Sequence, residues 1–312
     1  MENALVCEQC HSTKHVKMDC PAYKITSKFE NNGLSCGYNY KHYGVPLYDT
    51  HCHLDYVFDR FKHDNLSFQK FMQKENFPDN FKGCITSFSD PAAFSSFGIS
   101  SDLLTQDGIW GTFGIHPHHA KSYNQRIEDN IIKFLQHPKA VAVGECGLDY
   151  SFRCPSPIPV QKRVLLRHIK IAKDYMKPLV LHSREAEDDV FELLCLEGMK
   201  NWPIHVHCFT GHHSQLHRFI NEFENMYFGF TNLVSYSTAT TTHEVAKSIP
   251  LDRVLLETDA PYFVPRSLRD REQFSHPGNV LFVAEEIASI KNIDVDTVLE
   301  HCRRNVRKLY KI

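Results

Sequence analysis

From residue 45 onward, short apolar runs alternate with segments in which apolar residues recur every three or four positions. Short apolar runs are typical of buried strands, and the longer spacing is typical of helices that cover a sheet. The helical spacing is clearest over residues 160–176 and 187–199, and it returns over 279–309. The strand-like runs lie at residues 45–48, 82–88, 109–115, 140–145, 178–182, 203–208, 226–231 and 253–257.

Strand candidates separated by helical stretches predict an α/β protein with a parallel sheet. Eight successive repeats of a strand and a helix favour a closed TIM (β/α)8 barrel. The segment 279–309 would supply the closing helices, and three prolines at 155, 157 and 159 predict a stiff loop after the fourth strand. We therefore expect one barrel domain over 45–312 and a small separate segment over 1–44.

Composition changes this picture little. Hydrophobic residues make up 42% of the 312-residue chain, and the net charge of −2 gives no basic field typical of a nucleic-acid scaffold. A nuclease still fits, because bound metal cations would supply positive charge. With neither a secretory signal nor an apolar stretch of about 20 residues, and with eleven cysteines, we expect a nuclear or cytoplasmic protein with reduced thiols. The absence of a coiled-coil repeat favours a monomer.

Histidines and carboxylates stand at the ends of six of the eight predicted strands. In a barrel of this kind the carboxyl ends of the strands form the active-site face, so these side chains would meet there. One polar strand end could arise by chance, but six with metal-ligand chemistry predict a metal site. The residues are His51 and His53 (first strand), His116 and His118 (third), Glu145 and Asp149 (fourth), His182 and Arg184 (fifth), His207 (sixth) and Asp259 (eighth).

Six of these residues are the strongest ligand candidates. His51 and His53 are two residues apart in a strand, so they would project from the same face. Glu145 could bridge two ions with its two oxygens, and Asp259 would accept the proton of the attacking water. We expect divalent ions such as Zn²⁺ or Mn²⁺, bound by His51, His53, Glu145, His182, His207 and Asp259.

The remaining candidates are assigned to the substrate or to support. His116 is expected to contact a phosphate or the leaving oxygen, while His118 stays open between the site and loop support. Arg184 could fork onto a phosphate or form a plain surface salt bridge. His205 is expected to point away from His207 and to be structural.

Support roles are expected for residues between and beside the ligands. Asp55 and Asp149 are expected to form hydrogen bonds near the strand ends. Three cysteines alternate with the ligands and are expected in the core, namely Cys52, Cys146 and Cys208.

Six motifs, in this order, resemble the signatures of the TatD family of metal-dependent deoxyribonucleases. They are Asp-Thr-His-Cys-His-Leu-Asp from residue 49, Gly-Ile-His-Pro-His from 114, Gly-Glu-Cys-Gly-Leu-Asp-Tyr from 144, Leu-His-Ser-Arg-Glu-Ala from 181, His-Cys-Phe-Thr-Gly from 207 and Glu-Thr-Asp-Ala-Pro-Tyr-Phe from 257. The similarity covers roughly residues 47–312 and is strongest to the animal branch of the family.

The resemblance implies a TIM barrel of the metal-dependent hydrolase type that cleaves DNA or RNA, at 3′ ends or internally, with single strands or 3′ ends as the expected substrate. It also implies two or three divalent ions in the barrel (Mg²⁺, Mn²⁺ or Zn²⁺), with the six strongest candidates named above as the metal ligands. Two departures are Cys146, in a usually aliphatic position, and the segment 276–279, which replaces a commoner Asn-x-Pro pattern. Neither departure touches a proposed ligand.

The first 44 residues carry a different signal. Cys7, Cys10, His15 and Cys20 have the spacing of a zinc knuckle, which would bind one structural Zn²⁺ and could contact single-stranded nucleic acid. The glycines usual in the tight knuckle turns are missing, with His11 and Lys14 in their place. A tail without zinc is the alternative.

Two other functions fit these residues. A barrel hydrolase of amides or lactones would use the same ligands, since metal ions polarise carbonyl groups as readily as phosphoryl groups. By the resemblance, related amidohydrolases usually carry a carboxylated lysine that bridges the metal ions. Here Glu145 lies in the corresponding strand, which favours phosphodiester chemistry. A nucleic-acid-binding adaptor with an inert barrel is disfavoured by the intact ligand set.

Overall fold

The chain folds into one eight-stranded parallel sheet that curls into a barrel. The computed structural model describes residues 39–63, 67–94 and 97–312. Each strand pairs in parallel with the next, in the order β1 to β8. The strands are β1 (Leu47–Cys52), β2 (Phe81–Phe88), β3 (Ile109–Phe113), β4 (Ala140–Asp149), β5 (Leu179–Arg184), β6 (Ile204–Val206), β7 (Met226–Phe230) and β8 (Val254–Leu256).

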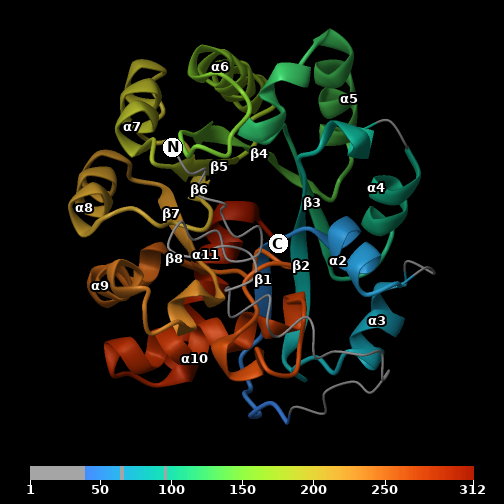
Figure 1. Cartoon of the computed structure of the whole chain (residues 1–312), viewed down its shortest axis with the longest axis vertical. Helices are drawn as coiled ribbons and strands as arrows, with labels where there is room; N and C mark the ends of the chain where they lie inside the picture. Colours follow the sequence, from blue (N-terminus) through green and yellow to red (C-terminus); the bar gives the residue numbers. More distant parts are fainter. Residues whose placement is uncertain (1–38, 64–66, 95–96) are drawn as a thin grey trace, which may run out of the picture.

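Helices follow the strands and surround the barrel, as Figure 1 shows for α2 to α10. The last helix, α11, instead lies across the centre of the view. The helices are α2 (Leu54–Arg60), α3 (Phe68–Lys74), α4 (Phe97–Leu104), α5 (Gln125–Leu135), α6 (Ile158–Asp174), α7 (Glu187–Leu196), α8 (His213–Glu222), α9 (Thr240–Ser248), α10 (Val280–Lys291) and α11 (Val295–Tyr310).

The two edge strands of the sheet meet near their carboxyl ends. The backbone N–H of Asp259 donates to the carbonyl oxygen of His51 (2.9 Å), and that of His53 donates to Ala260 (2.8 Å). The hydroxyl of Thr50 also donates to the carbonyl oxygen of Leu256 (2.9 Å). These bonds bring the residues after β1 and β8 together, and the predicted TIM-type barrel is confirmed as a nearly closed eight-stranded barrel.

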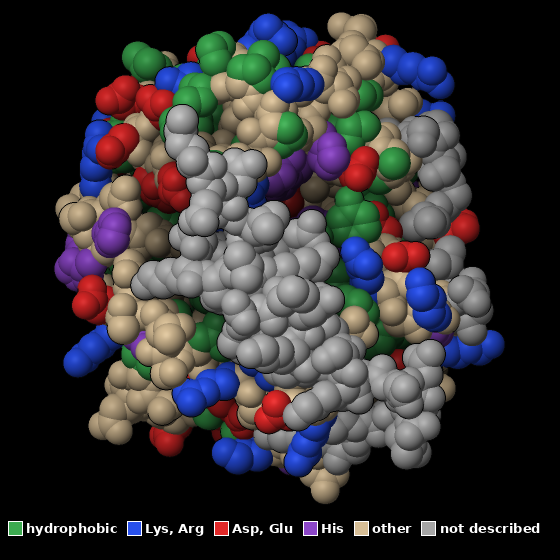
Figure 2. All heavy atoms as spheres, in the orientation of Figure 1, with side chains coloured by type: hydrophobic (Ala, Val, Ile, Leu, Met, Phe, Trp, Pro, Cys, Tyr) green, Lys and Arg blue, Asp and Glu red, His purple; other side chains and the backbone are tan. Residues whose placement is uncertain are grey.

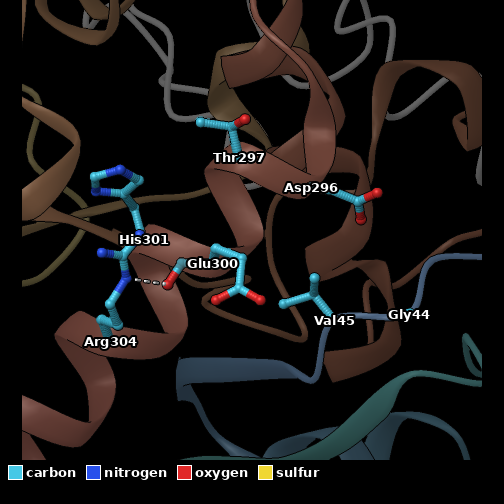
Figure 3. A pocket seen from close by; sticks show the side chains of 7 residues that line it. All are labelled: Gly44, Val45, Asp296, Thr297, Glu300, His301 and Arg304. Atoms are coloured by element: carbon cyan, nitrogen blue, oxygen red, sulfur yellow. Dashed lines mark hydrogen bonds between the residues drawn. The ribbon is translucent and has the colours of Figure 1, made fainter.

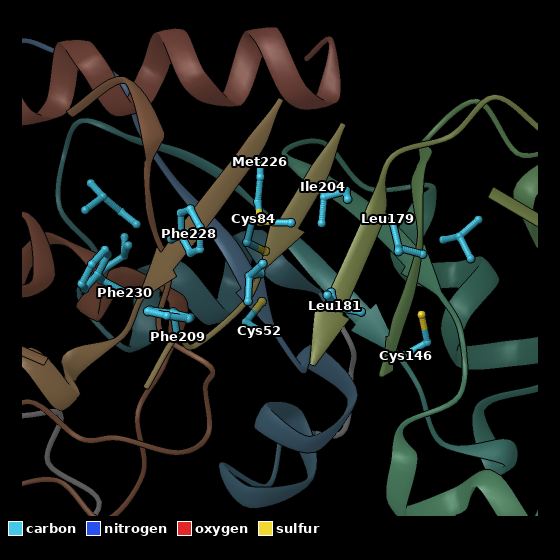
Figure 4. Close-up of a cluster of buried hydrophobic side chains, with 14 of the residues drawn as sticks. Cys52, Cys84, Cys146, Leu179, Leu181, Ile204, Phe209, Met226, Phe228 and Phe230 are labelled. Carbon is cyan, nitrogen blue, oxygen red and sulfur yellow. The ribbon is translucent and has the colours of Figure 1, made fainter. Parts of the chain in front are cut away.

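Alternation along each strand divides the core into two layers. Leu179 and Leu181 belong to the larger cluster, which packs between the sheet and the surrounding helices, whereas Val180 belongs to a smaller inner cluster. Figure 4 shows side chains of the larger cluster, including Cys52 and Cys146. Both cysteines are fully buried, as predicted.

Helix α11 completes the inner layer. Its residues Val306, Leu309 and Tyr310 pack with inner strand residues such as Val180 and Leu255. The helix thereby lies near the amino end of the barrel, away from the strand ends that carry the candidate ligands.

Two strands are longer than their apolar runs predict. β1 continues through Cys52, and β4 continues through Asp149, so His51 lies within β1 and Glu145 lies in the middle of β4. Side chains of β1 bond to the neighbouring strands, since the hydroxyl of Thr50 donates to Leu256 O in β8 and the thiol of Cys52 donates to Ile85 O in β2. In β4, the pairing register with β5 shifts between Val143 and Cys146, which marks an irregularity at Glu145.

The predicted division of the chain at residue 44 stays a prediction. The four expected zinc ligands lie outside the described residues, whereas Tyr40 and Tyr43 pack against the barrel. Their hydroxyls donate to Asn279 and Glu285, respectively, both at 3.0 Å. Among the described residues, no helix is long and apolar enough to cross a membrane.

Candidate metal centre

Glu145 lies at the centre of the predicted site, and one of its oxygens faces two other ligand candidates. Glu145 Oε2 lies 3.6 Å from His51 Nε2 and 3.8 Å from His53 Nε2. Asp259 Oδ1 lies 3.7 Å and 3.3 Å from the same two nitrogens. Ligand atoms of His51 in β1, His53 directly after it and Glu145 in β4 lie within 4.8 Å of one another, and Asp259 lies beside the two imidazoles.

The other oxygen of Glu145 faces a second set of imidazoles. Glu145 Oε1 lies 2.7 Å from His207 Nε2, 3.0 Å from His182 Nδ1 and 3.5 Å from His116 Nε2. The structure therefore brings all six strongest candidates together and adds His116. Glu145 stands between the two sets, which is the placement expected of a bridging carboxylate.

The donor set suits divalent metal ions. Imidazole nitrogens combined with carboxylate oxygens are ligands that Zn²⁺ and Mn²⁺ accept readily. Within the described part of the chain, His51 Nε2 is buried without a hydrogen-bond partner, although it faces two carboxylates. A bound cation would satisfy this nitrogen, so the residues present fit the predicted ions.

Electrostatics keep the central carboxylate ionised. Burial opposes ionisation of Glu145, but the fields of His207 and His116 and the hydrogen bond with His182 hold its pKa well below the ordinary value. Burial acts in the same opposing sense on His53, yet the hydrogen bond and charge of Asp259 raise the pKa of this imidazole to about 9. The charged form is thus favoured for Glu145 and His53, whereas burial lowers the pKa of His51 and that of His116 well below the ordinary value.

Hydrogen bonds to the other ring nitrogens fix the orientation of several imidazoles. His53 Nδ1 donates to the carbonyl oxygen of Ser87 (3.1 Å), and His182 Nε2 lies 3.2 Å from Asp149 Oδ2. The same oxygen of Asp149 lies 2.9 Å from His118 Nε2. Asp149 thus has the orienting contact expected of it, and its contact with His118 joins that residue to the edge of the cluster.

Left-handed backbone conformations help to aim the side chains at the strand ends. Cys208, directly after His207, has φ +43°, and Asp259 has φ +53°. Residues other than glycine rarely adopt this region, and such residues are frequent at functional sites.

The basic substrate candidate, Arg184, is half-buried at the end of β5. Among the described residues, no carboxylate forms an ion pair with its guanidinium, so the alternative of a surface salt bridge finds no support there.

Figure 2 shows histidine side chains near the centre of the face and others over α8, where His213 and His217 are exposed.

Sequence reasoning missed three supporting residues, namely Asp49, Ser87 and Ser89. Asp49 is buried and accepts hydrogen bonds from the backbone N–H (2.9 Å) and hydroxyl (2.5 Å) of Thr258. Ser87 and Ser89 each bond to Glu145, through its backbone N–H (3.2 Å) and its carboxylate (3.3 Å). These polar residues lie near the carboxyl ends of the first two predicted strands, and that position is the sequence signal by which they could have been identified.

The predicted orientation of His205 is wrong. Its Nε2 lies 2.8 Å from Glu257 Oε2, and its ring centroid lies 6.4 Å from that of His51, so it faces the same interior as His207. The reason is the strand period of two residues, which puts His205 and His207 on one face. Burial lowers the pKa of His205 to about 3, so the ring is neutral.

A separate pocket of about 450 Å³ lies between α11 and the segment that enters β1. Figure 3 shows its lining, which includes Asp296, Glu300 and Arg304. None of the candidate ligands lines it. The pocket is therefore distinct from the candidate metal centre.

Comparison with known families identifies the family of this chain. The family model described as TatD related DNase matches residues 48–311. The chain belongs to the TatD-related DNase family. This finding confirms the family predicted from the six motifs and, at the level of the family, the prediction of a metal-dependent nuclease.

Individual relatives agree with the family. The human 3′-5′ RNA nuclease TATDN2 is 40% identical over 85% of this chain, although the chain spans only 35% of its length. The 3′-5′ ssDNA/RNA exonuclease TatD of Klebsiella pneumoniae is 30% identical, covering 66% of this chain and 78% of its own length. The structure of YJJV, a TatD homologue from Escherichia coli, superposes with a TM-score of 0.74 at 25% identity, covering 85% of this chain and 98% of its own.

Proposed function

We propose that this chain hydrolyses phosphodiester bonds of single-stranded RNA or DNA in the 3′ to 5′ direction, with divalent ions at the Glu145 centre. The observation that carries the proposal is that the two oxygens of Glu145 face two separate sets of ligand atoms. The direction and the substrate rest on the names of relatives, which include a 3′-5′ RNA nuclease and a 3′-5′ ssDNA/RNA exonuclease.

Seven side chains would hold the ions. His51, His53 and Asp259 would do so on one side of Glu145, and His116, His182 and His207 on the other. Bound ions would supply Lewis acidity to the phosphoryl oxygens and would make water more acidic. Within the chain itself, the neighbouring histidines favour the ionised form of Glu145, and the hydrogen bond with Asp259 favours the protonated form of His53.

Asp259 is the residue we assign to accept the proton of the attacking water. Its side chain is more exposed than that of Glu145, at 13% against 2%, so it can reach both the centre and the solvent. Its backbone N–H is bonded to His51 (2.9 Å), which holds the residue after β8 against β1. The base is therefore fixed beside one set of ligands.

The rim of the centre offers contacts for phosphate and base. Arg184 presents a guanidinium without a carboxylate partner in the described structure, and a guanidinium can bond two phosphate oxygens at once. Tyr262 follows Asp259 closely, is 45% exposed, and its ring centroid lies 6.4 Å from that of His53. An exposed aromatic ring at this place would stack on an unpaired base, which favours single strands.

Labelled oligonucleotides test the proposal. Single-stranded RNA and DNA, labelled at the 5′ end, are incubated with the full chain in Mn²⁺, Mg²⁺ or EDTA. We expect a ladder that shortens from the 3′ end with metal and no product in EDTA. Asp259→Asn should reduce the rate at least about 100-fold, the lower range of a lost general base.

The control for this assay is Asp296→Asn, which changes a carboxylate in the separate pocket beside α11. We expect it to cleave like the unaltered chain. Metal-independent cleavage, or full activity of Asp259→Asn, would contradict the proposal. Hydrolysis of amides or lactones without cleavage of nucleic acid would favour the alternative of a carbonyl hydrolase.

Other predictions from the sequence stay predictions. They are the monomeric state, the nuclear or cytoplasmic location, and a structural Zn²⁺ at Cys7, Cys10, His15 and Cys20, which lie outside the described residues.

A further inference from the structure

A line of buried polar side chains runs through the inside of the barrel. The hydroxyl of Tyr310, in α11, lies 2.7 Å from His205 Nδ1, and His205 Nε2 lies 2.8 Å from Glu257 Oε2. The exposed fractions of Tyr310, His205 and Glu257 are 4%, 0% and 0%. The line joins the last helix, which lies across the centre of Figure 1, to the strands that carry the candidate ligands.

The surrounding backbone is shaped to admit Glu257. A Cβ atom on Gly229, in β7, would lie 2.3 Å from the carboxyl carbon and both oxygens of Glu257. Any larger residue at position 229 would therefore displace the carboxylate. Burial of a polar group costs free energy unless its contacts compensate for the lost water. The contacts of Glu257 therefore matter.

Glu257 contacts the backbone that aims a candidate ligand. Its Oε1 accepts a hydrogen bond from the backbone N–H of Cys208, the residue directly after His207. Cys208 holds the left-handed conformation with φ +43°, so the bond stabilises the turn at which β6 ends. The carboxylate thereby fixes the backbone from which His207 projects.

Glu257 also lies close to two candidate ligands. A carboxylate oxygen of Glu257, a ring nitrogen of His51 and a ring nitrogen of His207 all lie within 4.8 Å of one another. The rings of His51 and His207 stack, with centroids 4.0 Å apart. Because these two imidazoles come from opposite sides of Glu145, Glu257 underlies both halves of the centre.

His205 lies next to the carboxylate of Glu257, with His205 Nε2 2.8 Å from Glu257 Oε2, and Tyr310 contacts the other nitrogen of the His205 ring. When the hydroxyl of Tyr310 donates to Nδ1 of a neutral His205, the hydrogen of that ring stays on Nε2, where it faces Glu257. None of these three side chains lies at the open side of the centre. They act through other residues.

We propose that Tyr310, His205 and Glu257 are positioning residues that orient His51 and His207 for metal binding, so that α11 contributes to metal affinity. The inference rests on the proposed metal centre. Outer residues that orient metal ligands typically change metal affinity by about 10- to 100-fold when altered. A polar chain of this kind would explain why three polar side chains are buried together inside the barrel.

Metal binding to the full chain tests the proposal without any nuclease assay. Mn²⁺ is titrated into metal-free protein by calorimetry, and the unfolding temperature of the metal-free form is measured in parallel. We expect Tyr310→Phe, which removes a single hydroxyl, to weaken Mn²⁺ binding about 10-fold. The matched control is Tyr227→Phe, because Tyr227 lies in the same inner cluster and no hydrogen bond of its hydroxyl is found among the described residues.

A second variant keeps the test decisive. His205→Gln should weaken Mn²⁺ binding at least as much as Tyr310→Phe, and the double variant should bind no more weakly than His205→Gln alone, because both act through Glu257. Unchanged affinity in both single variants, or an equal loss in Tyr227→Phe, would overturn the proposal. If the variants lose metal as expected but the chain cleaves no nucleic acid, the proposed function fails and this inference stands.

Discussion

At the scale of single residues, Glu145 is the central residue of the proposed metal centre, because its two oxygens face two sets of imidazoles. Its low pKa has a physical cause: the nearby histidines outweigh the cost of burial. A carboxylate in this place can serve two ions at once, whereas an amide offers one oxygen and no charge. The residue could be predicted from the sequence because a lone glutamate ends an otherwise apolar run.

Glu145→Gln should therefore remove metal binding on both sides. We expect Mn²⁺ affinity to fall by more than about 100-fold, beyond the range typical of residues that only orient ligands. Calorimetric titration of the metal-free chain measures this loss. Glu128→Gln is the matched control, since Glu128 is a buried carboxylate that pairs instead with Arg167. Retained binding in Glu145→Gln would exclude the bridging role.

At the scale of elements, the apolar pattern predicted the strands better than it predicted the residues that support the candidate site. His51, His53 and His207 could be found because each ends or follows an apolar run. Asp49 could not be assigned, because its partner Thr258 lies 209 positions away in sequence and only closure of the barrel brings them together. The orientation of His205 follows from the strand period of two residues, which the sequence prediction applied incorrectly.

Helix α6 supports the loop that carries His116. His168 Nε2 accepts a hydrogen bond from the backbone N–H of Ile115 (3.0 Å), and burial lowers the pKa of His168 to about 4. In the unfolded chain, the pKa of His168 is near the ordinary value of about 6.5. Between that pH and about pH 4, His168 is protonated in the unfolded chain but not in the folded chain. The free energy of unfolding therefore falls as the pH drops from about 6.5 towards 4.

His168→Gln keeps a hydrogen-bond acceptor but removes this titration. In EDTA, the unaltered chain should lose about 2 kcal/mol more of its unfolding free energy than the variant does between pH 7 and pH 5. Urea unfolding at the two pH values measures the difference. Equal losses in the two proteins would show that His168 is not held neutral in the folded chain.

At the scale of the whole molecule, the barrel gathers ligands that are more than 200 positions apart in sequence at one end. The family and the barrel could be predicted because six motifs and eight strand candidates occur in order. The contacts of α11 with the inner layer could not, because the pattern of a closing helix does not reveal which strand residues it meets. The support for the metal centre thus emerges only from the folded chain.

Metal ions should also stabilise the fold as a whole. A ligand that binds only the folded state adds about 2.7 kcal/mol to the unfolding free energy at 100 times its dissociation constant. Melting curves should accordingly shift upward with Mn²⁺ relative to EDTA, and the shift should be absent in Glu145→Gln. A shift of equal size in that variant would place the stabilising ions elsewhere on the molecule.

The position of the ions tests the central claim most directly. Crystals of the full chain soaked in Mn²⁺ are measured at a wavelength where manganese scatters anomalously. We predict two strong anomalous peaks on either side of Glu145, one beside His51, His53 and Asp259, and one beside His116, His182 and His207. A single peak, or peaks that do not contact Glu145, would contradict the bridged centre.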